Sequence, residues 1–287
     1  MKGNLYLPYS NTKLDVKEKC DRRFFLKYHL KIKPENYGLP SPDTTKMDVG
    51  NTIHYIMEKY IGFIFSDRNI DKAEFKNIVN NTKYANNVKD LILLYEDGFF
   101  KVLNSIIKIK HKIKNIHVER FYSMDKKFTP SDKIFNTSFD AYKDMGSSYI
   151  FKPDVVIEYI DDRLTLLDFK TNMNLNKNNL FYYTNQILDY ASILNNIYNC
   201  GEVYTTICNV YTGEFFKNNV SPFVLDNTFK NLKRRLNNVF ESDICGDEIH
   251  PEKQRCMFCE YSEKTTVNGV EILGCDHIYS SIIESTI

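Results

Sequence analysis

Three charged residues in the middle of the chain have types and spacing suited to chemistry: Asp154, Asp168 and Lys170. They lie on two short β-prone runs, and the polar pair Asp161-Asp162 between the runs predicts a tight turn and therefore a hairpin. Side chains two residues apart on a strand project from the same face, so Asp168 and Lys170 lie together while Phe169 turns toward a core. Asp154 reaches that face if the strand register allows. The two runs are residues 151–159 and 164–171.

Two carboxylates side by side repel each other unless a cation lies between them, and a hard divalent ion such as Mg²⁺ or Mn²⁺ is the usual partner of oxygen ligands. An ammonium group beside that ion can stabilise charge on a phosphate or orient an attacking water. The three side chains therefore predict metal-assisted hydrolysis of a phosphate ester. The same residue types also fit a hairpin whose charges are only solvated, so the hairpin alone leaves both interpretations open.

The motif around these residues resembles that of the PD-(D/E)xK nuclease superfamily, because Pro153-Asp154 is followed, after thirteen residues, by Asp168-Phe169-Lys170. Where many relatives carry Gly-x-x-Asp, this chain has Lys152-Pro153-Asp154. The resemblance implies an α/β fold: a restriction-endonuclease-like core with a mixed central sheet, a helical insertion and a cysteine-rich C-terminal metal-binding subdomain. It also implies that Asp154, Asp168 and the Phe169 carbonyl bind the metal and that Lys170 assists catalysis.

An amphipathic helix is predicted after Gly50, and it carries a candidate metal ligand. Its apolar residues recur at the i, i+3, i+4 and i+7 positions of one helix face. His54 lies at the edge of that stripe, where a half-buried or surface histidine is the simpler interpretation. However, Gly50-x-x-x-His54 resembles a segment of the RecB-like nucleases in which the histidine completes the metal shell. The stripe consists of Ile53, Ile56, Met57, Tyr60, Ile61 and Ile64.

Glu119 is the remaining acidic candidate. Residues 116–122 alternate between apolar and polar types, which predicts the first strand of the sheet with Glu119 on it. The family resemblance implies a place near the metal and a catalytic role, whereas the adjacent Arg120 allows a plain surface ion pair. The segments expected around it are mostly helix over 71–114, strands at 134–142 and 148–157, and a turn at 143–146.

A helix predicted over 180–197 carries Gln186 and Tyr190 four residues apart, so the two side chains share one face. This pair follows Asp168-x-Lys170 closely in the sequence, and in that position it resembles the Gln-x-x-x-Tyr motif of RecB-like nucleases. The resemblance implies contacts with the substrate. The polar loop 172–179 before the helix is a suitable entrance for that substrate. A buried strand at 203–211 and a helix at 223–240 are expected to follow.

The chain has seven cysteines, which in a reducing compartment favour metal binding over disulfides. A Cys-x-x-Cys pair stands near the C-terminal end, and a further cysteine follows a hairpin signal at 266–272 that contains Asn-Gly. Together with Cys20, on a helix predicted over 13–30, they make four thiolates suited to a [4Fe–4S] cluster or to Zn²⁺. The three tail ligands are Cys256, Cys259 and Cys275.

The layout of one N-terminal and three C-terminal cysteines is similar to that of iron–sulfur RecB-like nucleases, which implies the cluster rather than zinc. The segment around Cys20 resembles the Cys-Pro-Arg-Arg-Phe-type segment of those proteins, with Asp21 in place of the proline. The interval from Cys259 to Cys275 is longer than in those relatives, so substitutes for Cys275 stay open. They are Cys245, His250 and His277.

Composition narrows the class of protein. With 287 residues and 43% hydrophobic content, the chain can bury a substantial core, and its net charge of +1 excludes a globally basic nucleic-acid binder. Contacts with nucleic acid would come from local basic clusters at 101–127 and 230–235, which equally fit solvated helix faces. No apolar run is long enough to cross a bilayer and no signal peptide is recognised, so we expect a cytoplasmic protein without a membrane partner.

The ordered motifs resemble the RecB-like nucleases over nearly the whole chain, as in the AddB nuclease domain and the CRISPR-associated RecB-like exonucleases. The resemblance implies a divalent-metal-dependent deoxyribonuclease, an exonuclease on single-stranded DNA or DNA ends in recombination, repair or CRISPR-type processing. It further implies a helicase, a recombination protein or a CRISPR adaptation protein as partner. The alternatives are a catalytically silent DNA-binding subunit and a structural zinc protein. One domain, 1–287, is expected, with an N-terminal helix (1–30), a helical region (50–115), a nuclease core (116–240) and a cluster-binding tail (241–287).

Overall fold

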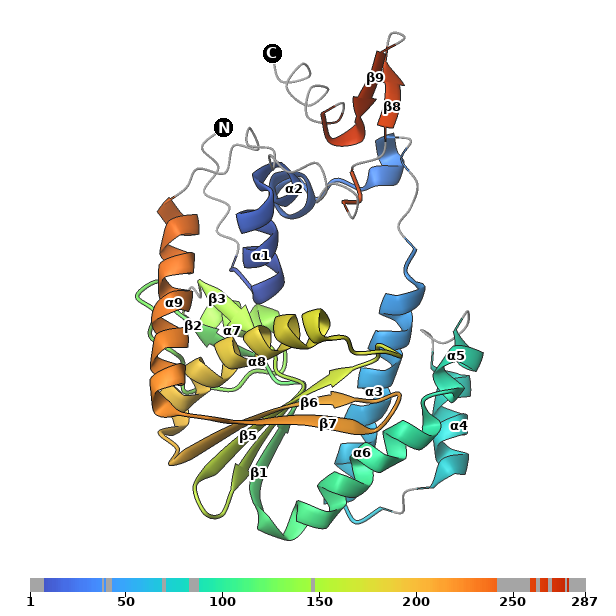
Figure 1. Cartoon of the computed structure of the whole chain (residues 1–287), viewed down its shortest axis with the longest axis vertical. Helices are drawn as coiled ribbons and strands as arrows, with labels where there is room; N and C mark the ends of the chain where they lie inside the picture. The colour runs from blue at the N-terminus through green and yellow to red at the C-terminus, as the bar shows by residue number, and fades with distance from the viewer. Residues whose placement is uncertain are drawn as a thin grey trace. The chain divides into compact units, whose positions relative to one another are not determined.

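The computed structural model describes residues 8–37, 39, 43–68, 71–82, 88–145, 148–241, 259–261, 264–267, 270–276 and 278 (Figure 1). The chain divides into two compact units. One unit is residues 44–232, and it contains the central sheet. The other unit, called the terminal unit below, draws on both ends of the chain, 1–43 and 233–287.

A five-stranded mixed sheet forms the centre of the 44–232 unit (Figure 1). β5 and β6 pair in parallel, and every other neighbouring pair of this sheet is antiparallel. A parallel pair needs a crossover connection, which the helix α8 (Lys177–Tyr198) provides between β5 and β6. The mixed α/β fold predicted from the sequence is therefore confirmed. In spatial order the strands are β1 (Ile113–Val118), β4 (Val155–Tyr159), β5 (Arg163–Lys170), β6 (Glu202–Asn209) and β7 (Glu214–Val220).

β5 is buried along almost its whole length because both faces of the sheet are covered. Leu167 and Phe169 lie in the main hydrophobic core. Leu166 and Asp168 project from the opposite face, since side chains alternate along a strand, and α8 packs against β5 and β6. The predicted hairpin is confirmed, because β4 pairs with β5 in antiparallel register with Val155 opposite Leu167.

The main core is built by helices that pack beside the sheet. α3 (Thr45–Phe65) buries all six residues of the predicted apolar stripe, and it starts upstream of Gly50, which lies inside the helix. Three further helices contribute buried residues to the same core, so the mostly helical segment predicted over 71–114 is confirmed. These helices are α4 (Lys72–Asn81), α5 (Lys89–Leu93) and α6 (Glu96–Ile109).

The strand predicted at 134–142 is wrong, because this segment leads into the helix α7 (Ser138–Met145). Thr137 Oγ1 accepts a hydrogen bond from Asp140 N at 3.1 Å, and such a cap stabilises the first turn of a helix. Phe135 keeps only an isolated β-bridge to Phe121. The turn predicted at 143–146 is also wrong over its described residues, since 143–145 belong to α7.

Two other predicted strands are interrupted beside the site described below. In 116–122, β1 ends at Val118 and β2 (Tyr122–Met124) begins only after a bend at Glu119. In 148–157, Pro153 has no N–H for a ladder bond, and it separates β3 (Tyr149–Phe151) from β4. β2 and β3 instead pair with each other as a second sheet. The sequence does not predict β7, because its central residues 217–219 are polar.

The terminal unit begins with helices that are shorter than predicted. α1 (Asn11–Lys19) starts after Ser10, whose hydroxyl accepts a hydrogen bond from Lys13 N at 3.4 Å. The continuous helix predicted over 13–30 is wrong, because the backbone is extended at Cys20, with φ −161 and ψ 107. A four-residue helix, α2 (Asp21–Phe24), and a π-helical turn, η1 (Phe25–His29), follow. Cys20 therefore occupies a helix end, and its sulfur accepts a hydrogen bond from Arg23 N at 3.4 Å.

The C-terminal elements agree with the sequence. α9 (Pro222–Glu241) confirms the helix predicted over 223–240. β8 (Lys264–Val267) and β9 (Val270–Leu273) pair in antiparallel fashion, which confirms the predicted hairpin, although Asn268-Gly269 lies outside the described residues. Among the residues that the structure describes, no helix is both long enough and apolar enough to cross a membrane.

Candidate active site

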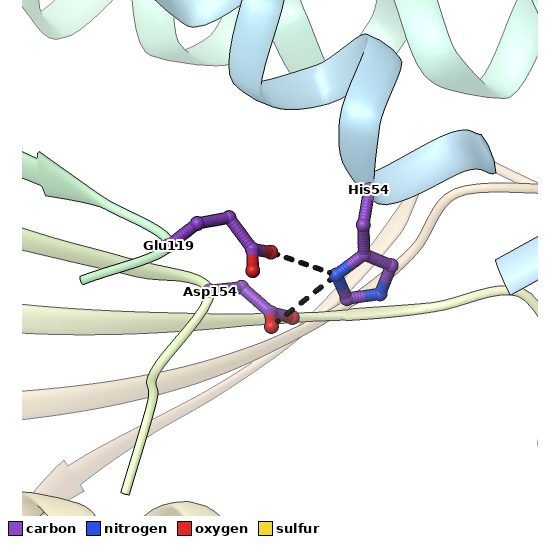
Figure 2. Close-up of side chains that lie close together, drawn as sticks. All are labelled: His54, Glu119 and Asp154. Atoms are coloured by element: carbon purple, nitrogen blue, oxygen red, sulfur yellow. Dashed lines mark hydrogen bonds and ion pairs between the residues drawn. The ribbon is translucent and has the colours of Figure 1, made fainter. Parts of the chain in front are cut away.

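An imidazole and two carboxyl groups meet beside the β4–β5 hairpin (Figure 2). His54 comes from α3, Glu119 follows β1 and Asp154 precedes β4. His54 Nδ1 lies 3.0 Å from Glu119 Oε1 and 3.4 Å from Asp154 Oδ1. Ligand atoms of the three residues all lie within 4.8 Å of one another, a spacing that one metal ion can bridge. The fold thus gathers candidate ligands that are far apart in the sequence.

The bend at Glu119 places its carboxylate in this group. Glu119 has φ 53, in the left-handed region, which costs a non-glycine residue about 1–2 kcal/mol. Its backbone N–H donates to the Asp154 carbonyl at 2.8 Å, so the end of β1 and the start of β4 are joined at this point. Lys152 Nζ contacts Glu119 Oε2 on the outer side. Strained conformations persist where neighbouring contacts hold them, and they concentrate at functional sites.

Asp168 and Lys170 approach the same place from β5. Lys170 Nζ lies 2.7 Å from Asp168 Oδ2, as expected for residues two apart on a strand. The intervening Phe169 N–H donates to Asp154 Oδ2 at 2.5 Å and ties that carboxylate to β5. The Phe169 ring points the other way into the core, where it meets the His54 ring edge to face at 6.1 Å between centroids.

Burial makes these charges interact strongly. Burial raises the pKa of Asp168 to about 6. Lys170 opposes this shift, and the Asp154 carboxylate adds to it. Burial alone would lower the pKa of His54, but Asp154 and Glu119 raise it to about 10. Burial would likewise lower the pKa of Lys170, yet Asp168 and Asp154 raise it. Each of these two basic side chains is therefore held by the carboxylates that surround it.

The residues of this site fit a divalent cation. Asp168 Oδ2 is buried, and it has no hydrogen-bond partner among the residues that the structure describes. Its contact with Lys170 is an ion pair without hydrogen-bond geometry, so this oxygen can still bind a cation. Carboxylate oxygens with an imidazole suit Mg²⁺ or Mn²⁺. The Lys170 carbonyl accepts a hydrogen bond from Val210 N, so it points toward the β6 side of β5. Successive carbonyls of a strand point in opposite directions, and the Phe169 carbonyl therefore points toward the β4 side, where Asp154 lies.

The chain matches a known protein family over most of its length. The model of the PD-(D/E)XK nuclease superfamily covers residues 8–263. The chain belongs to the PD-(D/E)XK nuclease superfamily. Membership indicates metal-dependent nuclease activity with a nucleic-acid substrate. A solved structure titled "Crystal structure of SSO0001" is similar over 83% of this chain and 94% of that chain, at 10% identity and a TM-score of 0.31. No curated protein matches the sequence.

Gln186 and Tyr190 of this PD-(D/E)XK nuclease lie on α8 beside the acidic residues. Gln186 Nε2 donates to Tyr190 Oη at 3.1 Å. The Tyr190 ring is 7% exposed and stacks on Phe151 with centroids 5.1 Å apart. Burial raises the pKa of Tyr190, the hydrogen bond from Gln186 opposes this shift, and the charges of Asp168 and Asp154 add to it. The structure therefore brings the predicted Gln-x-x-x-Tyr pair next to the predicted metal ligands.

Two residues at the site are missing from the set predicted by sequence, Lys152 and Tyr183. Lys152 contacts Glu119, and its position depends on the bend at Glu119, for which the sequence carries no signal. The Tyr183 ring centroid lies 4.3 Å from Lys170 Nζ. Tyr183 does have a signal, because it precedes Gln186 by three residues and therefore shares its helix face.

Three of the four predicted sulfur ligands lie in the terminal unit. Cys275 N donates to Tyr261 O at 2.7 Å, which joins Cys275 to the segment that follows Cys259. Burial raises the pKa of Cys259 to about 11 and that of Cys275 to about 12, and Cys20 adds to both effects. Cys259 packs against the small hydrophobic cluster that contains Cys275. The other predicted ligand and the three possible substitutes for Cys275 lie outside the described residues: Cys256, and Cys245, His250 and His277.

Proposed function

We propose that this PD-(D/E)XK nuclease is a divalent-metal-dependent deoxyribonuclease that degrades single-stranded DNA from free ends. The observation that carries the proposal is the convergence of His54, Glu119 and Asp154 on the β5 pair Asp168 and Lys170. Clustered carboxylate oxygens and an imidazole are ligands that a divalent cation can share once the His54 proton has left, and an ammonium beside them suits a substrate that gains negative charge as it reacts.

Metal binding and charge stabilisation are divided between these residues in the proposed mechanism. A bound Mg²⁺ or Mn²⁺ would lower the pKa of a water molecule and place positive charge at the phosphate. Lys170 stays protonated, because its acidic neighbours raise its pKa, so it donates hydrogen bonds to the attacking water or to a phosphate oxygen and does not act as a base. The proposed ligands are His54, Asp154, Asp168 and the Phe169 carbonyl, with Glu119 as a further catalytic acid group beside them.

The substrate side of the proposal rests on α8 and on the resemblance to RecB-like nucleases. Gln186 and Tyr190 are proposed to hold the DNA strand, since they flank the carboxylates and an amide and a phenol are poor ligands for a hard cation. A free end is supplied when another enzyme opens or cuts a duplex. A helicase, a recombination protein or a CRISPR adaptation protein is therefore proposed as partner.

The assay that tests this function uses the purified chain with three labelled substrates: linear single-stranded DNA, blunt duplex DNA and circular single-stranded DNA. We expect Mn²⁺ or Mg²⁺ to support progressive shortening of the linear single strand and EDTA to abolish it, because the cation supplies the nucleophile. The circle should resist. Cleavage of the circle would contradict the exonuclease assignment, and a lack of cleavage with every metal and substrate would leave a silent DNA-binding subunit as the function.

A [4Fe–4S] cluster in the terminal unit is a second part of the proposal, with Zn²⁺ as the alternative ion. Its support is that Cys20, Cys259 and Cys275 belong to one compact unit, although they come from segments at opposite ends of the chain, and that Cys259 packs beside the cluster that contains Cys275. Thiols with raised pKa values are neutral at pH 7, and a bound metal stabilises the thiolate form that ligation requires. Cys256 is proposed as the fourth ligand.

Removal of one sulfur ligand should release the cluster, because four thiolates from distant segments bind it cooperatively. We expect anaerobically purified Cys20→Ser and Cys275→Ser chains to lose bound iron and to melt at lower temperature. Cys200→Ser is the matched control, since Cys200 belongs to the 44–232 unit and should leave iron unchanged. Iron and zinc per chain are measured by elemental analysis. Iron retained in Cys275→Ser but lost in Cys245→Ser would replace Cys275 by Cys245 in the proposed ligand set.

A further inference from the structure

Two neighbouring tyrosines stand on the second turn of α8, at the entrance to the candidate site. The rings of Tyr182 and Tyr183 meet edge to face with centroids 5.7 Å apart. Tyr182 is 44% exposed, while Tyr183 is half-buried. Large aromatic rings at an exposed helix surface gain little by facing water, so a pair of this kind fits a planar ligand that covers them.

The pair is continuous with the candidate site through Tyr183. Lys170 Nζ lies 4.3 Å from the Tyr183 ring centroid and 2.7 Å from Asp168 Oδ2, so the ammonium bridges the ring and the carboxylate. The Tyr183 hydroxyl donates to Asn172 Oδ1 at 3.0 Å, which fixes the ring against the loop that leaves β5. A phosphate held by Lys170 would therefore place the attached nucleoside beside the two tyrosines.

We propose that Tyr182 and Tyr183 form a stacking platform for an unpaired base of the nucleotide next to the scissile phosphate. This inference rests on the proposed nuclease function and assigns single-stranded DNA as its substrate. Aromatic rings bind bases of any sequence because every base has a π-face. Bases inside a duplex already cover those faces by stacking and must first be unpaired.

The surroundings favour a nucleic acid over a protein partner at this place. Lys177, one and a half turns before Tyr182, is exposed and carries a positive charge on the same helix. The helix surface around the tyrosines carries the exposed polar residues Asn178 and Asn185 beside the exposed Phe181, whereas a stable protein interface needs a wide apolar centre. Positive charge beside aromatic rings is the combination found in grooves for single strands.

The test compares two fluorescent single-stranded oligonucleotides of equal length, one of thymidine and one of abasic residues, by anisotropy in EDTA so that no cleavage occurs. The wild-type chain should bind the thymidine oligomer more tightly. Tyr182→Ala should weaken that binding by about 5-fold to 150-fold, the equivalent of one lost stacking contact, and should leave binding of the abasic oligomer unchanged. Tyr182→Trp should restore it.

Phe181→Ala is the matched control, because Phe181 is 71% exposed on the same helix but lies about 200° around the helix axis from Tyr183. It should bind both oligomers like the wild type. The platform is overturned if the wild type does not prefer the thymidine oligomer, if Tyr182→Ala weakens both oligomers equally or neither, or if Phe181→Ala has the same effect. A chain that never cleaves DNA but shows the Tyr182 effect would refute only the proposed activity.

Discussion

Asp168→Asn will reduce divalent-dependent DNA cleavage by roughly 10²–10⁴-fold, the range seen when a charged catalytic group is lost. The change removes a charge without changing the size of the side chain. Asp168 is buried beside Asp154, so loss of the charge also relieves repulsion, and we expect a melting temperature close to that of the wild type. Affinity for Mn²⁺, measured by calorimetry, should fall together with cleavage.

Lys170→Met separates metal binding from catalysis on the same strand. The long apolar side chain fills similar space but lacks the ammonium, so cleavage should fall by a similar factor. Mn²⁺ should bind at least as tightly, because a positive charge has left the site. Asp161→Asn is the matched acidic control, since Asp161 is exposed in the turn at the far end of the hairpin. Wild-type cleavage by purified Asp168→Asn or Lys170→Met would refute the site.

Gly98→Ala will lower the free energy of unfolding by about 3 kcal/mol, the upper part of the range for overpacking. Gly98 lies in α6, and a Cβ added there would stand 2.3 Å from both the Val210 and the Tyr211 carbonyl oxygens. Real Cβ atoms do not approach other atoms so closely, and both oxygens belong to the backbone that follows β6. The helix would have to move away from the sheet, which would open the core.

Gly62→Ala provides the opposite control for this measurement. Gly62 lies in α3, where an added Cβ meets nothing within 4 Å, so alanine should stabilise the chain by about 0.5–1 kcal/mol through its better helix propensity. Urea unfolding of both variants measures the difference. Equal stability of Gly98→Ala and Gly62→Ala would mean that α6 does not pack against residues 210–211 as described.

Periodic segments of the fold could be predicted because their signal is local. The apolar stripe from Ile53 to Ile64 and the β-prone run before Lys170 each predict one element from local residues alone, whatever the rest of the chain does. The segment 134–142 failed because a single hydrogen-bonding cap at Thr137 outweighed its pattern and started α7. At Cys20, the sequence gives no sign of the extended backbone that divides the predicted helix.

In the candidate site, too, contacts between residues close in the sequence could be predicted, and contacts between distant residues could not. Asp168 and Lys170 are neighbours on one strand, so their contact follows from spacing alone. The contact between His54 and Glu119 needs α3 to cross the end of β1, and the approach of Lys152 to Glu119 needs a left-handed residue that no local pattern demands. Family resemblance, rather than physical chemistry of the sequence, pointed to His54 as a member of the site.

The division of the chain into a continuous unit and a discontinuous one has a consequence for synthesis on the ribosome. Residues 44–232 are complete in the nascent chain before any of the tail has been translated, and they can fold as they emerge. The terminal unit cannot close until both of its segments exist. At ~5–20 residues per second, Cys20 waits on the order of tens of seconds before Cys275 is made. The cluster proposed above therefore cannot close before the tail has been synthesised, which makes assembly of the terminal unit the last step in the biogenesis of this nuclease.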